Sequence, residues 1–433
     1  MKYEIEKGLF VTEDTREVGA DTYFLKTKLN SRYLDSLSSD IKVITPSELI
    51  DIWGLKDLKV VGITGTNGKT TTAAILYSIL TDLGEITALQ GTRGFFVDDK
   101  QLQEKSLTTP TTLQILHNMK SAKDLGAKYF VMEVSSHAIV QDRAEGIDFA
   151  LKVFTNVTQD HLDYHKTIEE YRAVKSRFFA DSGLKLINKD ESKKITFNPT
   201  KAYTYALDEG AAFKIDAFSL TDGIVGALNH LGEIATFKSS LVGLFNVYNL
   251  TAAISSAKLL TQKPLEEICD VVENFGGVSG RMEVVSQEPL IIVDFAHTPD
   301  GMLKVLESIK DKDISVVFGA GGDRDHDKRP KMGLAAARFA KKIYITSDNP
   351  RSEKPEDIIE DIARVLEGKE GVVKIVDRKE AIKRAVSELE ENEVLLILGK
   401  GDENYIEVNG KKTPYSDKET VLELINLSST ELS

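Results

Sequence analysis

The chain has 433 residues, a formal net charge of -13, 41% hydrophobic residues and 28% charged residues. These values are typical of a soluble globular protein with about two to four domains, and the acidic balance argues against broad binding to nucleic acid or anionic membranes. The single cysteine, Cys269, cannot form an internal disulfide, which fits a reducing cytoplasm. No run of about 18 apolar residues and no targeting segment is apparent, so we expect a cytoplasmic protein without membrane insertion.

Residues 1 to 57 are mixed in character. Ile41, Val43 and Ile44 suggest a brief strand. The segment Thr45–Glu48 predicts the start of a helix, because it has a capping Thr, a Pro at the first helical position and a Glu three residues after the cap.

From Leu58 onward, apolar runs alternate with stretches of helical spacing. The runs Val60–Ile63, Tyr129–Val134 and Leu151–Val157 predict buried strands, which indicates an α/β fold with a largely parallel sheet. Between Ile195 and Leu244 the runs become short and alternating, as in Phe213–Phe218, and this pattern predicts an antiparallel patch.

A helix-rich stretch, Val247–Val272, ends at Gly276-Gly277, which we interpret as a hinge. Beyond it a second alternation includes a helical segment at Ile358–Leu366 and predicts a second doubly wound domain. Its expected strands are Leu290–Asp294, Ile314–Phe318, Lys342–Thr346, Val373–Val376 and Val394–Leu398. We therefore expect domains at residues 1–57, 58–277 and 278–433.

The loop between the strand Val60–Ile63 and the helix Thr71–Leu83 is the most informative motif. Glycines let backbone N–H groups converge on phosphate oxygens, a lysine can reach the terminal phosphates, and a threonine hydroxyl can ligate Mg²⁺. The loop lacks the glycine that the common spacing has at position 63, and its alternative is a tight turn without a ligand. Its residues are Gly65, Thr66, Asn67, Gly68, Lys69, Thr70 and Thr71.

Polar residues also follow other expected strands. Glu133 ends one run, and Asp160 and His161 follow the next, at the edge where parallel sheets bind ligands. Glu133 is a candidate Mg²⁺ ligand, directly or through water. Taken alone, His161 is more simply interpreted as an ordinary polar loop residue, but together with Thr70 and Glu133 it favours a magnesium site.

Further groups lie near strand ends or helix starts. Arg324 and Arg351 follow two consecutive strands and could clamp carboxylates through paired hydrogen bonds. Arg143 could pair with an anionic substrate, and its alternative is a solvated surface charge. The remaining candidates are Thr108, Thr109, Ser135 and Gln141.

Together, these residues and the motifs that contain them resemble the Mur ligases, the ATP-dependent amide-forming enzymes of peptidoglycan synthesis. The resemblance extends from about Leu58 to Asp417 and is closest to the members that add the third residue to UDP-N-acetylmuramoyl-L-alanyl-D-glutamate. Ten motifs occur in order: GTNGKTT (65–71), LTTP (107–110), EVSSHA (133–138), TNVTQDHLDYH (155–165), YRAVKSRFF (171–179), GLFNVYN (243–249), SGRME (279–283), DFAHTPD (294–300), GGDRDHDKRPKMG (321–333) and DNPR (348–351).

The resemblance implies three domains that bind, in order, the UDP end of the substrate, ATP, and the incoming amino acid. ATP would phosphorylate the D-glutamate side-chain carboxylate to an acyl phosphate, which the amine of the third residue attacks. The implied partners are small molecules, namely UDP-MurNAc-L-Ala-D-Glu, meso-diaminopimelate and ATP, with Mg²⁺ as a cofactor. The sequence does not reveal the oligomeric state, and we expect a monomer.

The resemblance also implies roles for individual residues. Lys69, Lys175 and His161 would be catalytic, and Lys175 matches a lysine that is carbamylated in this family and helps hold a second Mg²⁺. Without the resemblance, the simpler interpretation of Lys175 is a lysine on the exposed surface of a helix. The implied metal site is Thr70, Glu133, His161 and Lys175.

The implied ATP contacts are the loop Gly65–Thr71 together with Asn246, Asn249, Arg281, Asp294 and His297, of which the last three would reach ATP only on domain closure. The implied muramyl-dipeptide contacts are Thr108, Thr109, Ser135, Gln141 and Arg143. The implied amino-acid pocket is Arg324, Asp348, Asn349, Pro350, Arg351, Gly399 and Glu403.

Arg351 decides the expected amino acid. In this family DNPR accompanies meso-diaminopimelate, whose distal carboxylate an arginine can pair, whereas lysine-adding relatives lack that arginine. The sequence departs from the family at Asp402, which replaces the histidine of GKGHE. The N-terminal domain is also short, and its uridine motif is matched only faintly, at Asp14–Arg16.

Three alternatives remain open. One is the same ligase acting on L-lysine, and another is a folylpolyglutamate synthetase, which shares the ATP-ligase chemistry but not the EVSSHA, GGDRD and DNPR motifs. The third is a P-loop nucleotide switch. Asn188–Glu191 resembles the guanine-reading NKxD motif, but Glu191 stands at the last position of that segment.

Overall fold

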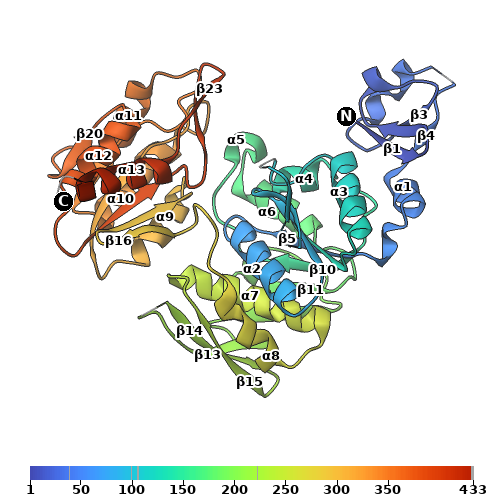
Figure 1. Cartoon of the computed structure of the whole chain (residues 1–433), viewed down its shortest axis with the longest axis horizontal. Coiled ribbons are helices and arrows are strands. Elements are labelled where there is room, and N and C mark those ends of the chain that lie inside the picture. The colour runs from blue at the N-terminus through green and yellow to red at the C-terminus, as the bar shows by residue number, and fades with distance from the viewer. Residues whose placement is uncertain (39, 99, 105–106, 222, 431–433) are drawn as a thin grey trace. The chain divides into compact units, whose positions relative to one another are not determined.

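The computed structural model describes residues 1–430 except residues 39, 99, 105–106 and 222. It divides into two compact units, which Figure 1 colours by residue number. The first unit comprises Met1–Val157, Thr167–Ser239 and Asn246–Phe275, and the second comprises Thr158–Lys166, Ser240–Phe245 and Gly276–Ser433. In the described part of the chain, no helix is both long and apolar enough to cross a membrane.

The N-terminal part of the first unit is a four-stranded sheet of order β1-β2-β3-β4. The helix that follows begins at a capping box, in which the Thr45 side chain and Glu48 bond each other's backbone N–H. This confirms the helix start predicted at Thr45–Glu48. The elements are β1 (Lys2–Glu6), β2 (Leu9–Thr12), η1 (Thr15–Glu17), β3 (Thr22–Leu25), η2 (Ser31–Ser36), β4 (Val43–Ile44), α1 (Pro46–Ile52) and η3 (Leu55–Asp57).

The rest of the first unit is built on an eleven-stranded sheet of order β15-β14-β13-β12-β11-β10-β5-β9-β6-β7-β8. Strands β13 to β6 in this order run parallel, whereas β13–β15 and β6–β8 are antiparallel ribbons. Its strands are β5 (Lys59–Thr64), β6 (Thr87–Gly91), β7 (Gly94–Val97), β8 (Lys100–Gln103), β9 (Tyr129–Glu133), β10 (Phe149–Phe154), β11 (Lys185–Asn188), β12 (Ala202–Ala206), β13 (Phe213–Ser219), β14 (Ile224–His230) and β15 (Glu233–Ser239).

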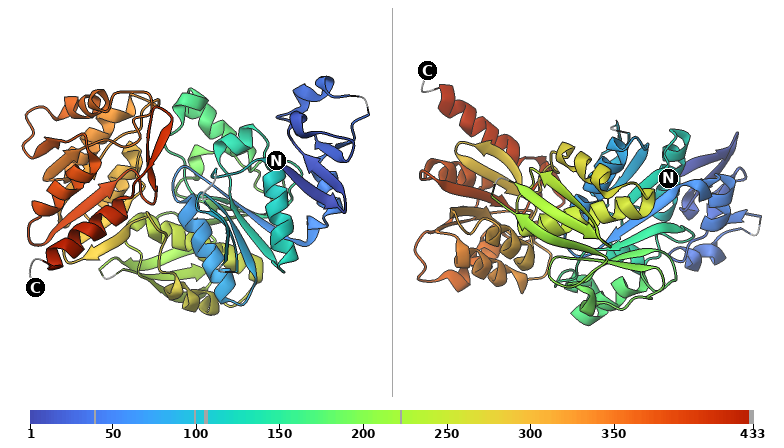
Figure 2. Two further views of the ribbon diagram at one scale, coloured as in Figure 1. Left: turned by 45° about the horizontal axis from the view of Figure 1, so that its top comes forward. Right: turned by 90° about the horizontal axis from the view of Figure 1, so that it is seen from below.

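Helices connect most of the parallel strands of this sheet. Two of them, α2 and α7, bury residues around most of their circumference, because their interior positions are mainly small or apolar. The antiparallel ribbon β13–β15 is lime green in Figure 2. The helices of this part of the chain are α2 (Lys69–Asp82), α3 (Thr112–Asp124), α4 (Ser136–Val140), α5 (Leu162–His165), α6 (Ile168–Arg177), η4 (Ser192–Lys194), α7 (Leu244–Thr261), α8 (Leu265–Asp270) and η5 (Val271–Asn274). Of these, α5 and the first two residues of α7 belong to the second unit.

The second unit contains a six-stranded sheet of order β16-β17-β21-β18-β19-β20, parallel except for the edge strand β16. Consecutive residues of β17, such as Ile291 and Ile292, belong to separate apolar clusters, so both faces of the sheet are covered. Its elements are β16 (Glu283–Gln287), β17 (Leu290–Asp294), α9 (Pro299–Glu307), β18 (Asp313–Phe318), α10 (Lys328–Phe339), β19 (Lys342–Ile345), α11 (Pro355–Ala363), η6 (Arg364–Leu366), β20 (Val372–Lys374), α12 (Arg378–Ser387), β21 (Glu393–Leu398), β22 (Tyr405–Val408), β23 (Lys411–Pro414) and α13 (Asp417–Thr430).

The α/β class and the largely parallel sheets are confirmed, as is the antiparallel patch. Every apolar run predicted to be a strand is a strand within about two residues, apart from the longer run ending at Val157, whose strand stops at Phe154. The sequence did not reveal β1–β3 or the ribbon β6–β8. The helix-rich stretch near Val247–Val272 is interrupted at residues 262–264, where Pro264 lacks the N–H that a continuous helix needs.

Candidate functional site

The loop Gly65–Thr71 connects β5 to α2, as predicted. Gly68 caps α2 with φ +84, and a Cβ there would lie 2.4 Å from Asn249 Oδ1. A Cβ at Gly65 would lie 1.9 Å from Thr155 Oγ1. Both glycines are therefore required by close packing, and at Gly68 the backbone conformation also disfavours any side chain.

The segment after β10 holds this loop in place. Asn67 N donates to Asn156 Oδ1 at 2.9 Å, and Thr155 Oγ1 donates to Asn67 O at 2.7 Å. Thr66 N donates to Asn156 O at 2.9 Å. The backbone of the loop is thus fixed by strand-end residues, which is the preorganisation that a phosphate site needs.

Two lysine ammonium groups meet at one loop carbonyl. Lys69 Nζ donates to Gly65 O at 2.9 Å and to Thr66 O at 2.8 Å. Lys175, from α6, is 1% exposed and donates to the same Gly65 O at 2.9 Å, with its ammonium 4.6 Å from the centre of the Tyr171 ring. The structure therefore buries Lys175 beside the loop, and the interpretation of this residue as a surface lysine is wrong.

Oxygen donors suited to Mg²⁺ lie beside the loop. Thr70 Oγ1 donates to Glu133 Oε2 at 2.9 Å, and the backbone N of Thr92 donates to Glu133 Oε1 at 2.8 Å. Glu133 is 2% exposed. A threonine hydroxyl and a carboxylate in contact are the hard oxygen ligands that Mg²⁺ prefers, so these residues fit the ion.

The other two predicted metal ligands have contacts of their own. Lys175 contacts Gly65 O, and His161 lies in Thr158–Lys166, the segment that belongs to the second unit. His161 is 43% exposed, with Nε2 3.5 Å from Asp160 Oδ2. Among the described residues, no three His, Cys, Asp or Glu side chains gather as a ready metal site.

Asn246 and Asn249, on α7, lie beside the start of α2. Thr72 Oγ1 donates to Asn249 Oδ1 at 3.3 Å, and Asn249 Nδ2 donates to Asn246 Oδ1 at 2.9 Å. The structure thus brings both asparagines to the loop Gly65–Thr71, from a segment about 180 residues further along the chain.

The predicted dipeptide-binding residues also form a connected group. Thr109 Oγ1 donates to Glu133 O at 2.9 Å and accepts from Ser135 N at 2.9 Å. Arg143 donates to Thr109 O and, through Nε, to Gln141 Oε1 at 2.9 Å. Thr108 joins the same group, because Thr92 Oγ1 donates to its hydroxyl at 3.2 Å.

In the second unit, three predicted nucleotide contacts surround the end of β17. Asp294 accepts from the backbone N of Met282 and of Ala296, both at 2.7 Å. Burial raises the pKa of Asp294, although Arg281 and these N–H groups oppose the shift. The Arg281 guanidinium lies 4.4 Å from the centre of the Phe295 ring.

His297 lies on the same loop. Its Nδ1 is 2.9 Å from Phe295 O, and its ring meets the Phe295 ring edge-on at 4.8 Å. Burial lowers the pKa of His297, and nearby Lys328 lowers it further, which favours the neutral imidazole.

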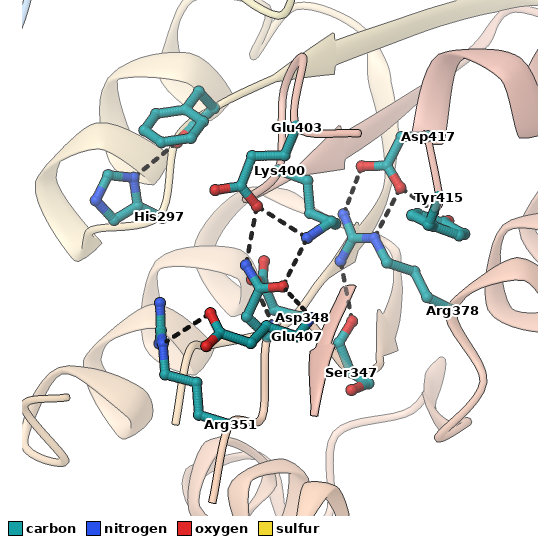
Figure 3. A network of polar contacts seen from close by, with 12 residues as sticks. His297, Ser347, Asp348, Arg351, Arg378, Lys400, Glu403, Glu407, Tyr415 and Asp417 are labelled. Carbon is teal, nitrogen blue, oxygen red and sulfur yellow. Dashed lines mark hydrogen bonds and ion pairs between the residues drawn. The ribbon is translucent and has the colours of Figure 1, made fainter. Parts of the chain in front are cut away.

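The predicted amino-acid pocket lies at the ends of β19 and β21 (Figure 3). Asn349 Nδ2 donates to Glu403 Oε2 at 2.9 Å. Gly399 has φ +114, and a Cβ there would lie 2.7 Å from Asp348 Oδ2. Asn349, Glu403, Asp348 and Gly399 are therefore close neighbours, as the resemblance implies.

Arg351 is held by the surrounding backbone. Its own φ is 51, Nη1 donates to Gly322 O at 2.7 Å, and Nε lies 3.8 Å from Glu407 Oε2. A Cβ at Gly321 would lie 2.9 Å from Arg351 Nη1 and 3.7 Å from Arg324 Cγ, so the two arginines flank this glycine. Pro350 packs against Gly322, because a Cβ at Gly322 would lie 1.9 Å from the carbonyl oxygen of Pro350.

Three further charged residues of this region were not singled out from the sequence. Lys400 is fully buried, Glu407 faces Arg351, and Arg378 is paired with Asp417 by bonds of 2.8 Å (Figure 3). Arg378 also donates to the carbonyls of Ser347 and Leu398, the residues just before the two pocket loops. The GKG motif at residues 399–401 was a signal for Lys400, whereas nothing in the sequence pointed to Arg378.

The charges of this region hold Asp348 ionised. Burial alone favours the protonated acid, but Lys400 and Arg378 outweigh it and lower the pKa of Asp348 below its ordinary value of 3.8.

Residues 63–257 match the Mur ligase middle domain, and residues 280–401 match the Mur ligase, glutamate ligase domain. The chain is 49% identical to the UDP-N-acetylmuramoyl-L-alanyl-D-glutamate--2,6-diaminopimelate ligase of Helicobacter pylori, over 97% of this chain and 96% of the relative. It is 50% identical to the ligase of the same name from Wolinella succinogenes, over 95% of each chain.

Solved structures agree with these relatives. A structure of a UDP-N-acetylmuramoyl-L-alanyl-D-glutamate--2,6-diaminopimelate ligase matches 97% of this chain and 95% of its own, with a TM-score of 0.67 and 30% identity. A Mycobacterium tuberculosis folylpolyglutamate synthase complexed with ADP and AMPPCP covers 82% of this chain and 91% of its own, with a TM-score of 0.69. At 18% identity, this second likeness shows a shared fold alone.

Proposed function

Because the chain belongs to the Mur ligase family, we propose that it is an ATP-dependent ligase that joins meso-2,6-diaminopimelate to UDP-N-acetylmuramoyl-L-alanyl-D-glutamate. The observation that carries this proposal is the 49% identity, over 97% of the chain, to a relative named for that reaction. The new amide bond forms at the D-glutamate side-chain carboxylate. We expect the reaction in the cytoplasm, as a step in making peptidoglycan precursors.

The reaction has two chemical steps. The D-glutamate carboxylate attacks the γ-phosphorus of ATP, so that ADP leaves and an acyl phosphate forms. The neutral amine of diaminopimelate then attacks the acyl carbon, phosphate leaves, and the amine loses a proton. The first step brings two anions together, so it needs cationic groups and Mg²⁺ at the transferred phosphoryl group.

The loop residues supply that charge. We assign Lys69 to the terminal phosphates, because its ammonium lies against the loop carbonyls at the start of α2. Thr70 and Glu133 would hold Mg²⁺, which neutralises phosphate charge when bound. The contact between the Thr70 hydroxyl and the Glu133 carboxylate supports this assignment.

Lys175 would act in the same site after carbamylation. Its ammonium shares Gly65 O with Lys69, so the loop carries two cations at one point. A carbamate would replace one of them with anionic oxygens, which suit a second Mg²⁺. We also assign His161 to this site, although it lies on the segment that belongs to the second unit.

The nucleotide contacts come from both units. Asn246 and Asn249 support the proposal because they lie against the phosphate loop. Arg281, Asp294 and His297 would complete the ATP site from the second unit, so catalysis would require the two units to act on one nucleotide.

The dipeptide would be held by the group around Thr109. This group connects directly to Glu133, because Thr109 Oγ1 bonds the Glu133 carbonyl. Arg143 is its cationic member and would pair with a substrate anion. Binding here would bring the D-glutamate carboxylate toward the phosphate loop.

Diaminopimelate, rather than lysine, fits the second-unit pocket. Arg351 is anchored by the Gly322 carbonyl, and its planar guanidinium suits the distal carboxylate that lysine lacks. Glu403 and Asp348 would attract the distal ammonium group. The pocket thus offers partners for both charges of that end of the molecule.

The proposal is tested by phosphate release with ATP, Mg²⁺, UDP-MurNAc-L-Ala-D-Glu and a panel of amino acids. We expect release that depends on both the dipeptide and diaminopimelate. Equal turnover with L-lysine would contradict the assignment of Arg351. Turnover with a folate and glutamate, or nucleotide hydrolysis that needs no amino acid, would contradict the proposed ligase.

A further inference from the structure

Lys400 lies in the loop after β21, between two glycines of positive φ. Gly399 has φ +114 and Gly401 has φ +55, and Gly399 N donates to Asp294 O at 3.0 Å. This backbone turns the side chain of Lys400 into the protein, where it is 0% exposed. Burying an ammonium group costs free energy unless the group is paired, so the hydrogen-bond partners of Lys400 indicate its role.

Its partners are two side chains of the amino-acid pocket. Lys400 Nζ donates to Glu403 Oε2 at 2.9 Å and to Asn349 Oδ1 at 3.2 Å. Asn349 Nδ2 donates to the same Glu403 oxygen at 2.9 Å. This bond closes a triangle with the pair of Lys400 and Glu403, which Figure 3 shows. The lysine therefore restrains both side chains at once.

The triangle also fixes which way the Asn349 amide faces. Its oxygen accepts from Lys400 and from the backbone N of Glu407 at 2.9 Å, so its nitrogen must face Glu403. Without the ammonium group, Glu403 would keep one partner in the triangle, and its charge would lose the cation beside it.

The two neighbouring arginines, Arg378 and Arg351, do not substitute for Lys400. Arg378 is committed to Asp417 through two bonds of 2.8 Å and to backbone carbonyls. Arg351 points to Gly322 O and Glu407. Of the described residues, Lys400 is the lysine or arginine bonded to Glu403.

We propose that Lys400 is a positioning residue that holds Glu403 and Asn349 in the orientation that receives the distal amino–carboxylate end of diaminopimelate. This inference rests on the proposed function, because it assumes that this pocket binds the amino acid. Lys400 acts through Glu403 and Asn349, and it has no part in binding ATP or the dipeptide.

The test is a comparison of Lys400→Met with wild type, with KM measured separately for diaminopimelate, ATP and the UDP-dipeptide. We expect KM for diaminopimelate to rise about tenfold to a hundredfold, as for losing hydrogen bonds to a charged group, with the other two KM values within about twofold. An unchanged KM for diaminopimelate, or an equal rise in all three, would overturn the inference.

Lys185→Met is the matched control. Lys185 is also 0% exposed and donates three bonds, but to the carbonyls of Asp181, Gly183 and Thr200 in the first unit. Its loss should lower stability and leave KM for diaminopimelate unchanged. If Lys400→Met does not fold, Lys400→Gln keeps a hydrogen-bond donor without the charge and should give the same KM pattern.

A double-mutant cycle separates positioning from general damage. If Lys400 acts in part through Glu403, then Lys400→Met should raise KM for diaminopimelate by a clearly smaller factor in a Glu403→Gln background than in wild type. Fully additive effects would refute this route. Lack of diaminopimelate-dependent phosphate release by wild type would refute the proposed function and the inference, whereas an active wild type with an unaffected Lys400→Met refutes the inference alone.

Discussion

Gly68 and Gly84 form a natural pair for testing the phosphate loop, because they flank the same helix α2 and both have φ +84. An alanine at either position adopts a left-handed conformation, which costs about 1–2 kcal/mol. At Gly84 a Cβ meets nothing within 4 Å, so Gly84→Ala should lower the free energy of unfolding by about that strain alone.

Gly68→Ala should cost more, because its Cβ would lie 2.4 Å from Asn249 Oδ1. Asn249 is buried and bonded to Thr72 and Asn246. If it moves and loses both bonds, the additional cost is about 1–3 kcal/mol. The movement also displaces a proposed nucleotide contact, so KM for ATP should rise at least about tenfold in Gly68→Ala and stay at the wild-type value in Gly84→Ala.

The assay is urea unfolding of both variants together with steady-state kinetics at varied ATP. The proposed role of Gly68 is refuted if the two variants are equally stable and bind ATP equally well. It is also refuted if Gly84→Ala impairs ATP binding as much as Gly68→Ala does.

Three further predictions follow from individual contacts. Arg351→Met should raise KM for diaminopimelate about tenfold to a hundredfold, because it removes a charged hydrogen-bonding partner. The control Arg338→Met, at an exposed position on α10, should leave that KM unchanged. Equal effects of the two variants in steady-state kinetics would contradict the assignment of Arg351. Glu133→Gln should raise the Mg²⁺ concentration for half-maximal activity at least about tenfold, measured by magnesium titration, and an unchanged titration would remove Glu133 from the metal site. Because the pKa of Asp348 is lowered in the folded state, its charge stabilises the protein above the ordinary pKa of 3.8, and this contribution is lost as the pH falls through the lowered pKa. Asp348→Asn should therefore be less stable to urea than wild type at pH 7, and the difference in stability should shrink below pH 3.8. A difference in stability that does not depend on pH would contradict this prediction.

The central strands of both parallel sheets were predictable, because they are buried on both faces and appear in the sequence as continuous apolar runs. Val60–Ile63 and Val394–Leu398 are examples, and both became central strands. The N-terminal strands were missed for the opposite reason. Strand β1 alternates exposed and half-buried residues, and it carries Lys2, Glu4 and Glu6, so its pattern lacks an apolar run.

For the site, residues within short motifs were predictable, whereas partners from distant segments were not. The contact between Thr70 and Glu133 follows from two strand ends at the same sheet edge, which the parallel pattern implies. The burial of Lys175 does not follow, because α6 shows a lysine at an ordinary helical position and only the fold places it against Gly65. Arg378 and Asp417 meet across 39 positions in the chain, and no local pattern marks them as a pair.

We propose that this ligase adds diaminopimelate because Arg351 lies in its amino-acid pocket as a partner for the distal carboxylate. One reaction tests it most directly: wild-type protein with ATP, Mg²⁺, UDP-MurNAc-L-Ala-D-Glu and equal concentrations of meso-diaminopimelate and L-lysine, with products identified by mass. We predict that the diaminopimelate tripeptide is the dominant product. Equal amounts of the two tripeptides, or a lysine product alone, would contradict it.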